Sequence, residues 1–321
     1  MRFAVIGAGG IGCYYAARLI DAGEDVCLIA RGDHLKALQN NGLKVMHPQL
    51  TFHQSVKALS MEDWFKQTPP DGVDVLIVCL KGMHTQAFAE QLKHWFDRLT
   101  GSESPLILSL QNGVENEKII AGMVPDAVIV GGIARRIGAH IVAPGVIQAR
   151  GPAQVILGIW PDHQQVQDKL LIKVNALADH FNRAAIPTQV SSDINRELWR
   201  KLIVNNGVNP LCALLEMETG QATHHPGLQR LIRGAMAEAA TAASAMGVTL
   251  TNADIEEMFN LIYTFGSIKP SMLVDREKGR QLELEEICGV IIRGCQALGQ
   301  DAPYNRCIAT LLSVALEQSK S

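Results

Sequence analysis

The sequence lacks several features that mark other classes of protein. Its seven cysteines are scattered and form no CxxC pair, so neither a zinc site nor a disulfide framework is indicated. No uninterrupted apolar stretch reaches about 18 residues, and we expect no membrane span. The net charge of -3 gives no electrostatic reason to expect nucleic acid or an anionic membrane as partner. A reduced, cytoplasmic protein is the expectation that remains.

Apolar residues, in contrast, are plentiful. The 321 residues are 47% hydrophobic and 19% charged, which favours a globular fold with a substantial core over disorder. At roughly 100 to 200 residues per domain, this length predicts two domains. No internal repeat or low-complexity segment interrupts the chain.

The first part of the chain alternates strand and helix signals. Continuous apolar runs rich in branched side chains predict buried parallel strands, at residues 3–9, 25–30, 73–81, 106–113 and 127–134. Between the first two runs, residues 11–23 have helical periodicity and end at Gly23. This alternation predicts a Rossmann-like, doubly wound α/β sheet.

The pattern changes towards the middle of the chain. Residues 137–160 contain short strand-like pieces separated by glycine and proline, which predict antiparallel additions to the same sheet. Residues 186–190 read as its last strand, and from Ser192 onwards nearly everything has helical periodicity. We therefore expect an α/β domain over residues 1–191 and an all-helical domain over residues 192–321.

A glycine-rich turn follows the first predicted strand and opens the first predicted helix. The GxGxxG pattern spans Gly7, Ala8, Gly9, Gly10, Ile11 and Gly12. In such a turn the glycines permit a tight bend, let the backbone approach a pyrophosphate and bring helix and strand together. The helix N-terminus then presents N–H groups to the phosphates. The strand–turn–helix context predicts dinucleotide binding rather than a merely structural turn.

The residue after the second predicted strand bears on the choice of dinucleotide. An acid at that position accepts hydrogen bonds from a ribose 2′-hydroxyl, whereas Arg31 can hold a 2′-phosphate with charge-assisted bonds. NADP is therefore expected over NAD. Asp33 could weaken the preference, and Arg31 could instead be a solvated loop residue. Lys81 follows the third strand at the edge where ligands bind, although lysines after strands are also common on surfaces.

One helical segment of the second domain carries an unusual polar stripe. Lys201, Asn205 and Asn209 are spaced four apart, which places them on one face of a helix among apolar neighbours. An ammonium and two carboxamides are costly to bury without partners, and together they suit a polar anionic substrate. The alternative is a solvated stripe whose amides bond to neighbouring backbone.

Taken together, these motifs resemble the 2-dehydropantoate 2-reductase (ketopantoate reductase) family over essentially the whole chain. The most specific is the RKLxxNxxxNP pattern around Lys201. The matching pieces, in order, are GAGGIG, IAR, VCLKG, LQNGV, ELWRKLIVNNGVNPLCAL, THHPG, SMLVD, LELEEICG and PYN. The resemblance implies a Rossmann-like domain followed by a helical domain like that of 6-phosphogluconate dehydrogenase.

The resemblance also implies an activity and roles for residues. The activity is the NADPH-dependent reduction of 2-dehydropantoate to pantoate in pantothenate and coenzyme A biosynthesis. Lys201 matches the proton donor, and Glu283, which periodicity would not single out, matches a glutamate that holds cofactor and substrate. Further positions match by resemblance: Asn112, Asn205, Asn209 and Ser271 for substrate, and the glycine-rich turn, Arg31, Lys81, Asn112 and Glu283 for cofactor. No metal is implied, and a homodimer is compatible with the family.

Some positions depart from the family pattern around the substrate. Thr219 stands where a larger polar residue is usual, and Val274 where glutamine is common. The adjacent His224 and His225 have no third ligand at hand, which favours a capping or surface role over a metal site. The chain could therefore be a related reductase of another small 2-oxo acid or imine, or a non-catalytic NADPH-binding redox sensor.

Overall fold

The computed structural model describes residues 1–100, 104–161 and 168–318. Two units are distinguished by the contacts that their residues make. Unit 1 holds Met1–Gln111 and Asn116–Ile194, and unit 2 holds Asn112–Glu115 and Asn195–Ser321. The loop at Asn112–Glu115 thus belongs to the helical unit, although it follows a strand of unit 1.

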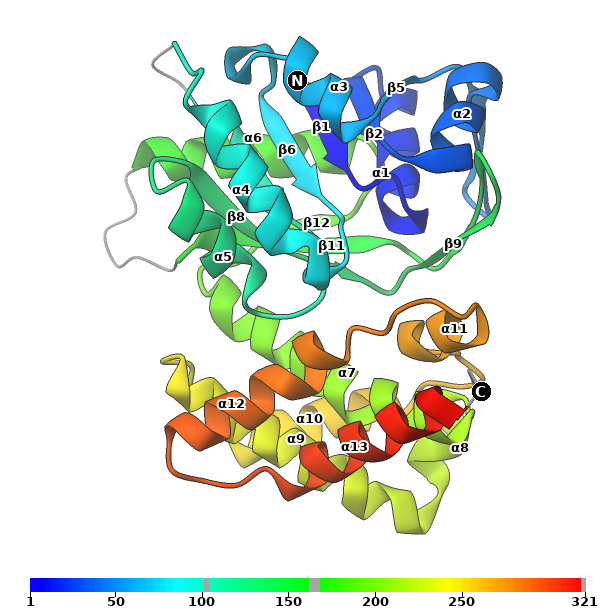
Figure 1. The fold of residues 1–321 in the computed structure, drawn as a ribbon, viewed down its shortest axis with the longest axis vertical. Helices are drawn as coiled ribbons and strands as arrows, with labels where there is room; N and C mark the ends of the chain where they lie inside the picture. Colours follow the sequence, from blue (N-terminus) through cyan, green and yellow to red (C-terminus); the bar gives the residue numbers. More distant parts are fainter. Residues whose placement is uncertain (101–103, 162–167, 319–321) are drawn as a thin grey trace. The chain divides into compact units, whose positions relative to one another are not determined.

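An eight-stranded sheet runs through the middle of unit 1 (Figure 1). Its strand order is β12-β11-β8-β7-β6-β1-β2-β5, and every neighbouring pair is parallel except β8 with β11. The strands are β1 (Arg2–Ile6), β2 (Asp25–Ile29), β5 (Lys57–Leu59), β6 (Val75–Val78), β7 (Leu106–Ser109), β8 (Val128–Arg135), β11 (Gln154–Trp160) and β12 (Thr188–Val190). The predicted Rossmann-like sheet is confirmed.

Strand alternation divides the apolar side chains of this sheet between two cores. Phe3 and Val5 of β1 join one core with residues of α1 and α6, whereas Ala4 and Ile6 join the other with residues of α3, α4 and α5. Both faces of the sheet are therefore covered, as continuous apolar strands require. The helices of unit 1 are α1 (Gly10–Asp21), α2 (Gly32–Asn41), α3 (Met61–Gln67), α4 (Thr85–Phe96), α5 (Asn116–Met123) and α6 (Asp168–Arg183).

A second, four-stranded sheet corrects one prediction. We expected all the strand-like pieces of residues 137–160 to extend the large sheet, but only β11 does so. The remaining pieces, β9 (Gly138–Ala143) and β10 (Val146–Arg150), form a separate sheet with β3 (Leu43–His47) and β4 (Leu50–Gln54), in the order β4-β3-β10-β9. All four of its strands contact α1, which also contacts β1 and β2. The sequence pattern predicts strands within residues 137–160 but neither β3 and β4 nor the pairing of β10 with β3, which lies far earlier in the chain.

Unit 2 is helical throughout its described part, as expected. Its first helix, α7 (Ile194–Leu215), runs as one element with Pro210 inside it. Gly207 lets α9 approach closely, since a Cβ there would lie 2.9 Å from Met236 Cγ. The other elements are α8 (Thr219–His224), α9 (Pro226–Ala245), α10 (Asn252–Tyr263), α11 (Ser271–Glu277), a π-helical turn η3 (Glu285–Gly289), α12 (Val290–Ala297) and α13 (Pro303–Gln318).

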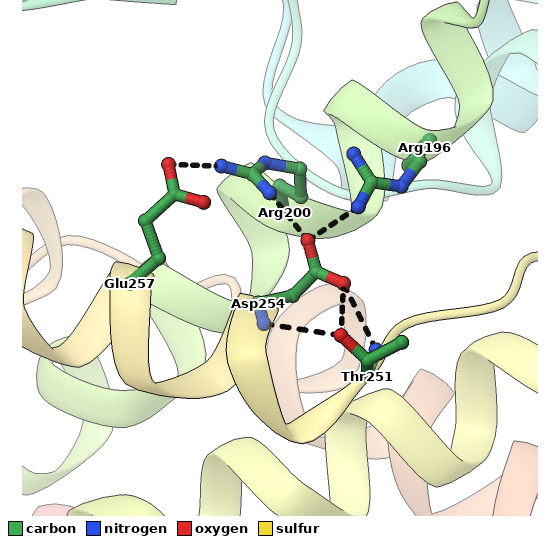
Figure 2. Close-up of polar contacts among 5 residues, drawn as sticks. All are labelled: Arg196, Arg200, Thr251, Asp254 and Glu257. Carbon is green, nitrogen blue, oxygen red and sulfur yellow. Dashed lines mark hydrogen bonds and ion pairs between the residues drawn. The ribbon is translucent and has the colours of Figure 1, made fainter.

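A buried carboxylate fastens the first turns of α7 to the start of α10 (Figure 2). Arg196 and Arg200 each donate to Asp254 Oδ1 at 2.5 Å, and Arg200 also reaches Glu257 at 2.6 Å. The backbone N–H and hydroxyl of Thr251 both donate to Asp254 Oδ2 at 2.9 Å in a capping box. Burial alone would raise the pKa of Asp254, but these hydrogen bonds and the two guanidinium charges outweigh it and hold the pKa below its ordinary value.

We predict that Asp254→Ala lowers the free energy of unfolding by about 3 kcal/mol at neutral pH, because it removes the buried carboxylate that Arg196 and the half-buried Arg200 share. A carboxylate whose pKa is depressed by folding stabilises above its ordinary value of 3.8 and ceases to do so as pH falls through the lower, folded pKa. Urea unfolding at neutral pH and at about pH 3 should therefore show the difference between variant and wild type shrinking in acid. Glu257→Ala is the control, because that carboxylate is 63% exposed and should matter little. A difference that grows in acid would contradict this account.

Candidate functional site

The site predicted in unit 1 lies where three parallel strands end. β1 lies between β2 and β6, with Ile6 in register with Ile29 on one side and with Val78 on the other. The glycine-rich turn, Arg31 and Lys81 follow these three strand ends, so the fold brings them to one edge of the sheet. The chain leaves β1 to one side for β2 and returns on the other side as β6, and ligands of doubly wound sheets bind at such a reversal.

The glycine-rich turn is built around Gly7, whose φ of +97° favours glycine. The N–H groups of Gly7 and Ala8 donate to the carbonyl of Ile29 at 3.2 and 2.9 Å, which holds the turn against the end of β2. A Cβ on Gly7 would also lie 3.0 Å from the backbone of Cys79. Conformation and close approach therefore both require glycine at this position.

The start of α1 has the properties that a phosphate site needs. Gly9 is the N-cap residue of α1. All residues of the first turn are described by the structure, and among them no side chain caps the helix and none is acidic. A Cβ on Gly9 would meet nothing within 4 Å, so the backbone is open to an approaching ligand. Ile11 packs against the core, and a Cβ on Gly12 would lie 2.4 Å from the carbonyl of Gly7. These observations fit a pyrophosphate held by backbone N–H groups.

Gly10 serves a different purpose. A Cβ there would lie 2.1 Å from the carbonyl oxygen of Ala139 on β9, which is backbone and cannot move aside as a side chain could. The small sheet thus packs directly on the glycine-rich turn. The backbone of Ala139 therefore supports the turn.

The cationic residues of unit 1 differ in exposure. Arg31 is exposed at the N-cap of α2 with extended backbone, and among the described residues it forms no ion pair. Asp33, which could have neutralised it, pairs instead with Lys36 at 3.4 Å. Lys81 is half-buried directly before the short helical turn η2 (Gly82–His84). Arg31 is thus available to an anionic group.

His34 supports the turn and was missed by sequence reasoning. Its Nδ1 accepts the N–H of Gly145 at 3.0 Å, and its Nε2 lies 3.6 Å from Cys13 Sγ, which itself donates to the carbonyl of Ala8. Burial lowers the pKa of His34, partly offset by a hydrogen bond to the Ala8 backbone. A neutral imidazole therefore links α2, the turn and the small sheet. The sequence feature that could have identified His34 is its position three residues after Arg31.

In unit 2 the polar stripe lies on α7. Lys201 and Asn205 are half-buried and Asn209 is 3% exposed, while Leu202, Ile203 and Val208 are buried apolar residues beside them. Such a stripe is too buried to be an ordinary solvated face.

The predicted polar residues of unit 2 form two hydrogen-bonded pairs, one between the stripe and α11 and one between two loops. Asn209 Nδ2 lies 3.4 Å from Ser271 Oγ at the start of α11, and Asn112 Nδ2 donates to Glu283 Oε2 at 3.2 Å. Glu283 is 9% exposed, and Leu284 alone separates it from η3. Four of the predicted residues thus form two contacting pairs, and their roles towards substrate stay predictions.

The paired histidines have structural contacts in unit 2. His225 caps α9, since its ring accepts the N–H of Leu228 at 3.3 Å, and His224 stacks on Tyr263 at 4.2 Å between ring centroids. Among residues 1–100, 104–161 and 168–318, no group of three or more His, Cys, Asp or Glu side chains has an arrangement suited to a metal ion. None of the described helices is both long and apolar enough to span a bilayer.

The fold and these residues define a class of proteins in which a Rossmann-like unit precedes a helical unit. Within that class, the chain belongs to the ketopantoate reductase PanE/ApbA family. Residues 3–162 match the family's N-terminal domain and residues 193–316 match its C-terminal domain.

Relatives match almost the whole chain. It is 31% identical to the 2-dehydropantoate 2-reductase of Pyrococcus abyssi, over 95% of this chain and 94% of that protein. The crystal structure of 2-dehydropantoate 2-reductase from Geobacter metallireducens GS-15 is 30% identical, with a TM-score of 0.84 over 98% of this chain and 100% of that one. A PanE/ApbA family ketopantoate reductase from Ralstonia eutropha JMP134 superposes with a TM-score of 0.85 at 27% identity, over 100% of both chains.

Two glycine substitutions should separate folding from dinucleotide binding. Gly10→Ala should lower the free energy of unfolding by about 1 to 3 kcal/mol, because the methyl group overlaps the Ala139 carbonyl. Gly9→Ala should leave the melting temperature unchanged but weaken NADPH binding by about tenfold or more, because it places a methyl group where the backbone must approach the phosphates. Thermal melts and NADPH fluorescence titrations check both, and unimpaired binding by Gly9→Ala would contradict the assignment of the turn.

Proposed function

We propose that this protein reduces 2-dehydropantoate to pantoate with NADPH, in the synthesis of pantothenate and coenzyme A. The observation that carries the proposal is the family match through both units, at residues 3–162 and 193–316, with relatives named for this reaction over nearly their whole length. Residues suited to the cofactor and residues suited to the substrate both lie within the matched segments.

The cofactor half of the proposal rests on unit 1. The open backbone at Gly9, the start of α1 and the exposed Arg31 together suit a dinucleotide with a 2′-phosphate. Lys81, from the adjacent strand end, adds a second cation. When bound, NADPH supplies the hydride, and the protein contributes orientation and charge.

The substrate half rests on α7. As hydride reaches the keto carbon, negative charge develops on the oxygen, and we assign Lys201 to stabilise that charge and donate the proton. The resulting neutral amine regains its proton from solvent. Asn205, Asn209 and Ser271 are proposed to bind the carboxylate and hydroxyl groups, and the contact between Asn209 and Ser271 supports a shared role. Glu283, held by Asn112, is proposed to orient cofactor and substrate.

We predict that Lys201→Ala lowers kcat by about 10²- to 10⁴-fold, because the proton donor is lost. NADPH affinity should be largely retained, because the lysine acts on the substrate. The measurement is NADPH oxidation at 340 nm with 2-dehydropantoate, beside a fluorescence titration of NADPH. Near-normal turnover by the variant would refute the assigned role.

The same assay separates the alternatives for wild-type protein. Turnover of another 2-oxo acid or an imine, but not of 2-dehydropantoate, would change the substrate and preserve the reductase. NADPH binding without oxidation by any compound of the panel would indicate the redox sensor.

Arg31→Asp should raise KM for NADPH about 10- to 150-fold, which corresponds to the loss of one charge-assisted contact of about 1.5 to 3 kcal/mol. KM for NADH should change much less, because NADH has no 2′-phosphate. Lys66→Glu makes the same change of charge at a side chain that is 68% exposed on α3, and should leave both constants unaltered. Equal effects of Arg31→Asp on the two cofactors would contradict the 2′-phosphate role.

A further inference from the structure

We propose that Asn206 is a positioning residue for this reduction: it fixes α7, which carries Lys201, against the turn that follows Glu283. The inference rests on the proposed function for the roles of Lys201 and Glu283. It concerns a residue that neither the polar stripe nor the resemblance to the family singles out.

The turn after Glu283 departs from regular α-helix. Glu285–Gly289 form the π-helical turn η3 between Glu283 and α12. A π turn holds one residue more than an α turn, and such turns occur frequently at functional sites. The N–H of Ile287 donates to the carbonyl of Glu283 at 3.2 Å, so η3 and Glu283 are directly linked. A contact that fixes Ile287 therefore also helps to fix the position of Glu283.

Asn206 supplies a contact to this turn from α7. Its amide nitrogen lies 3.4 Å from the carbonyl of Ile287 and 3.8 Å from Cys288 Sγ. The same nitrogen donates to Asn305 Oδ1 at 2.5 Å. Asn206 is 1% exposed, so these bonds are shielded from water.

The partner of Asn206 is itself firmly held. Asn305 Nδ2 donates to Glu238 Oε2 at 2.8 Å and to the carbonyl of Ala235 at 3.3 Å. Glu238, 8% exposed, also accepts the N–H groups of Tyr304 and Asn305 at 2.8 and 2.9 Å, in the first turn of α13. A carboxylate is favoured at the N-terminus of α13, because the first N–H groups of a helix have no partner within it and the helix dipole is positive at this end. The network thus joins α7, η3, α9 and α13.

Asn206 uses the donor of its side-chain amide but leaves the acceptor unpaired among the described residues. Asn206 Oδ1 is buried and, within the described part of the chain, has no hydrogen-bond partner. An unsatisfied buried carbonyl costs about 1 to 3 kcal/mol, which an apolar side chain of similar size would avoid. The amide nitrogen, however, is the donor that reaches both Ile287 and Asn305. We infer that this donor is what the position requires.

The position of Asn206 on α7 explains how it acts. It lies five residues after Lys201, about 140° further round the helix, so it faces the packed interior while Lys201 is half-buried. Fixing Asn206 against η3 therefore sets the rotation of α7 and with it the direction of Lys201. Misplacing a catalytic group by about 1 Å can cost about 10²-fold in rate. Arg196, Arg200 and Asp254 hold the start of the same helix from α10 (Figure 2).

The test compares Asn206→Leu with a matched control in the assay of NADPH and 2-dehydropantoate. Asn206→Leu keeps the approximate shape but removes the donor, and should lower kcat about 10²-fold with NADPH affinity within about twofold of wild type. The pH dependence of kcat should also change, because a misdirected Lys201 would donate its proton less effectively. The control, Ile262→Ala, removes a fully buried side chain of α10 and should lower the melting temperature with kcat and pH profile unchanged. Wild-type kcat and pH profile in Asn206→Leu would overturn the proposal.

A second measurement does not depend on activity. In Asn206→Leu, amide hydrogen exchange of residues 282–290 should accelerate more than that of the rest of unit 2, and in Ile262→Ala it should not. Unchanged exchange in this segment would overturn the proposal, whether or not the wild-type protein turns over a 2-oxo acid. A wild-type protein that turns over no 2-oxo acid would refute the proposed function, which is a separate result. If Asn206→Leu does not fold, Asn206→Ala removes the same donor without adding bulk, and both measurements apply to it unchanged.

Discussion

The constraint that shapes both units is that polar groups removed from water must find partners within the protein. α7 illustrates it, because this largely buried helix carries charged and amide side chains along its length. Asp254 satisfies the arginines of its first turns, Asn305 and Ile287 engage Asn206, and Ser271 contacts Asn209. Each contact also restricts how the helix can turn or slide. The stripe proposed to bind substrate is thus oriented by the same bonds that permit its burial.

Unit 1 meets the same constraint with backbone groups. The turn after β1 exposes N–H groups that a regular strand or helix would have paired. The carbonyl of Ile29 accepts the N–H groups of Gly7 and Ala8, and the carbonyl of Gly7 accepts that of Gly9. The first turn of α1 is left without a side-chain cap. A ligand with phosphate oxygens can complete these bonds, which explains why the turn needs open backbone at Gly9 and close support at Gly10.

The two units offer different kinds of polar group, and this difference explains why cofactor binding is proposed for unit 1 and substrate binding for unit 2. Unit 1 offers backbone donors, the exposed Arg31 and the half-buried Lys81, which suit a large, multiply charged cofactor that binds over an extended surface. Unit 2 offers a few half-buried or buried polar side chains, which suit a small polar substrate whose orientation must be set closely. A reductase needs both kinds of site, because the hydride comes from the cofactor and the proton from the protein.

The sequence by itself determined the features that depend on local order: the alternation of strand and helix, the glycine-rich turn with Arg31 after the next strand, and the stripe at Lys201, Asn205 and Asn209. Each is a short pattern whose geometry follows from helix or strand periodicity. Only the tertiary structure decided the partners. It moved Gly138–Ala143 and Val146–Arg150 to a separate sheet, paired Asn112 with Glu283, and distinguished Asn206 from the adjacent Asn205. These outcomes depend on residues distant in the chain, whose proximity no local pattern encodes.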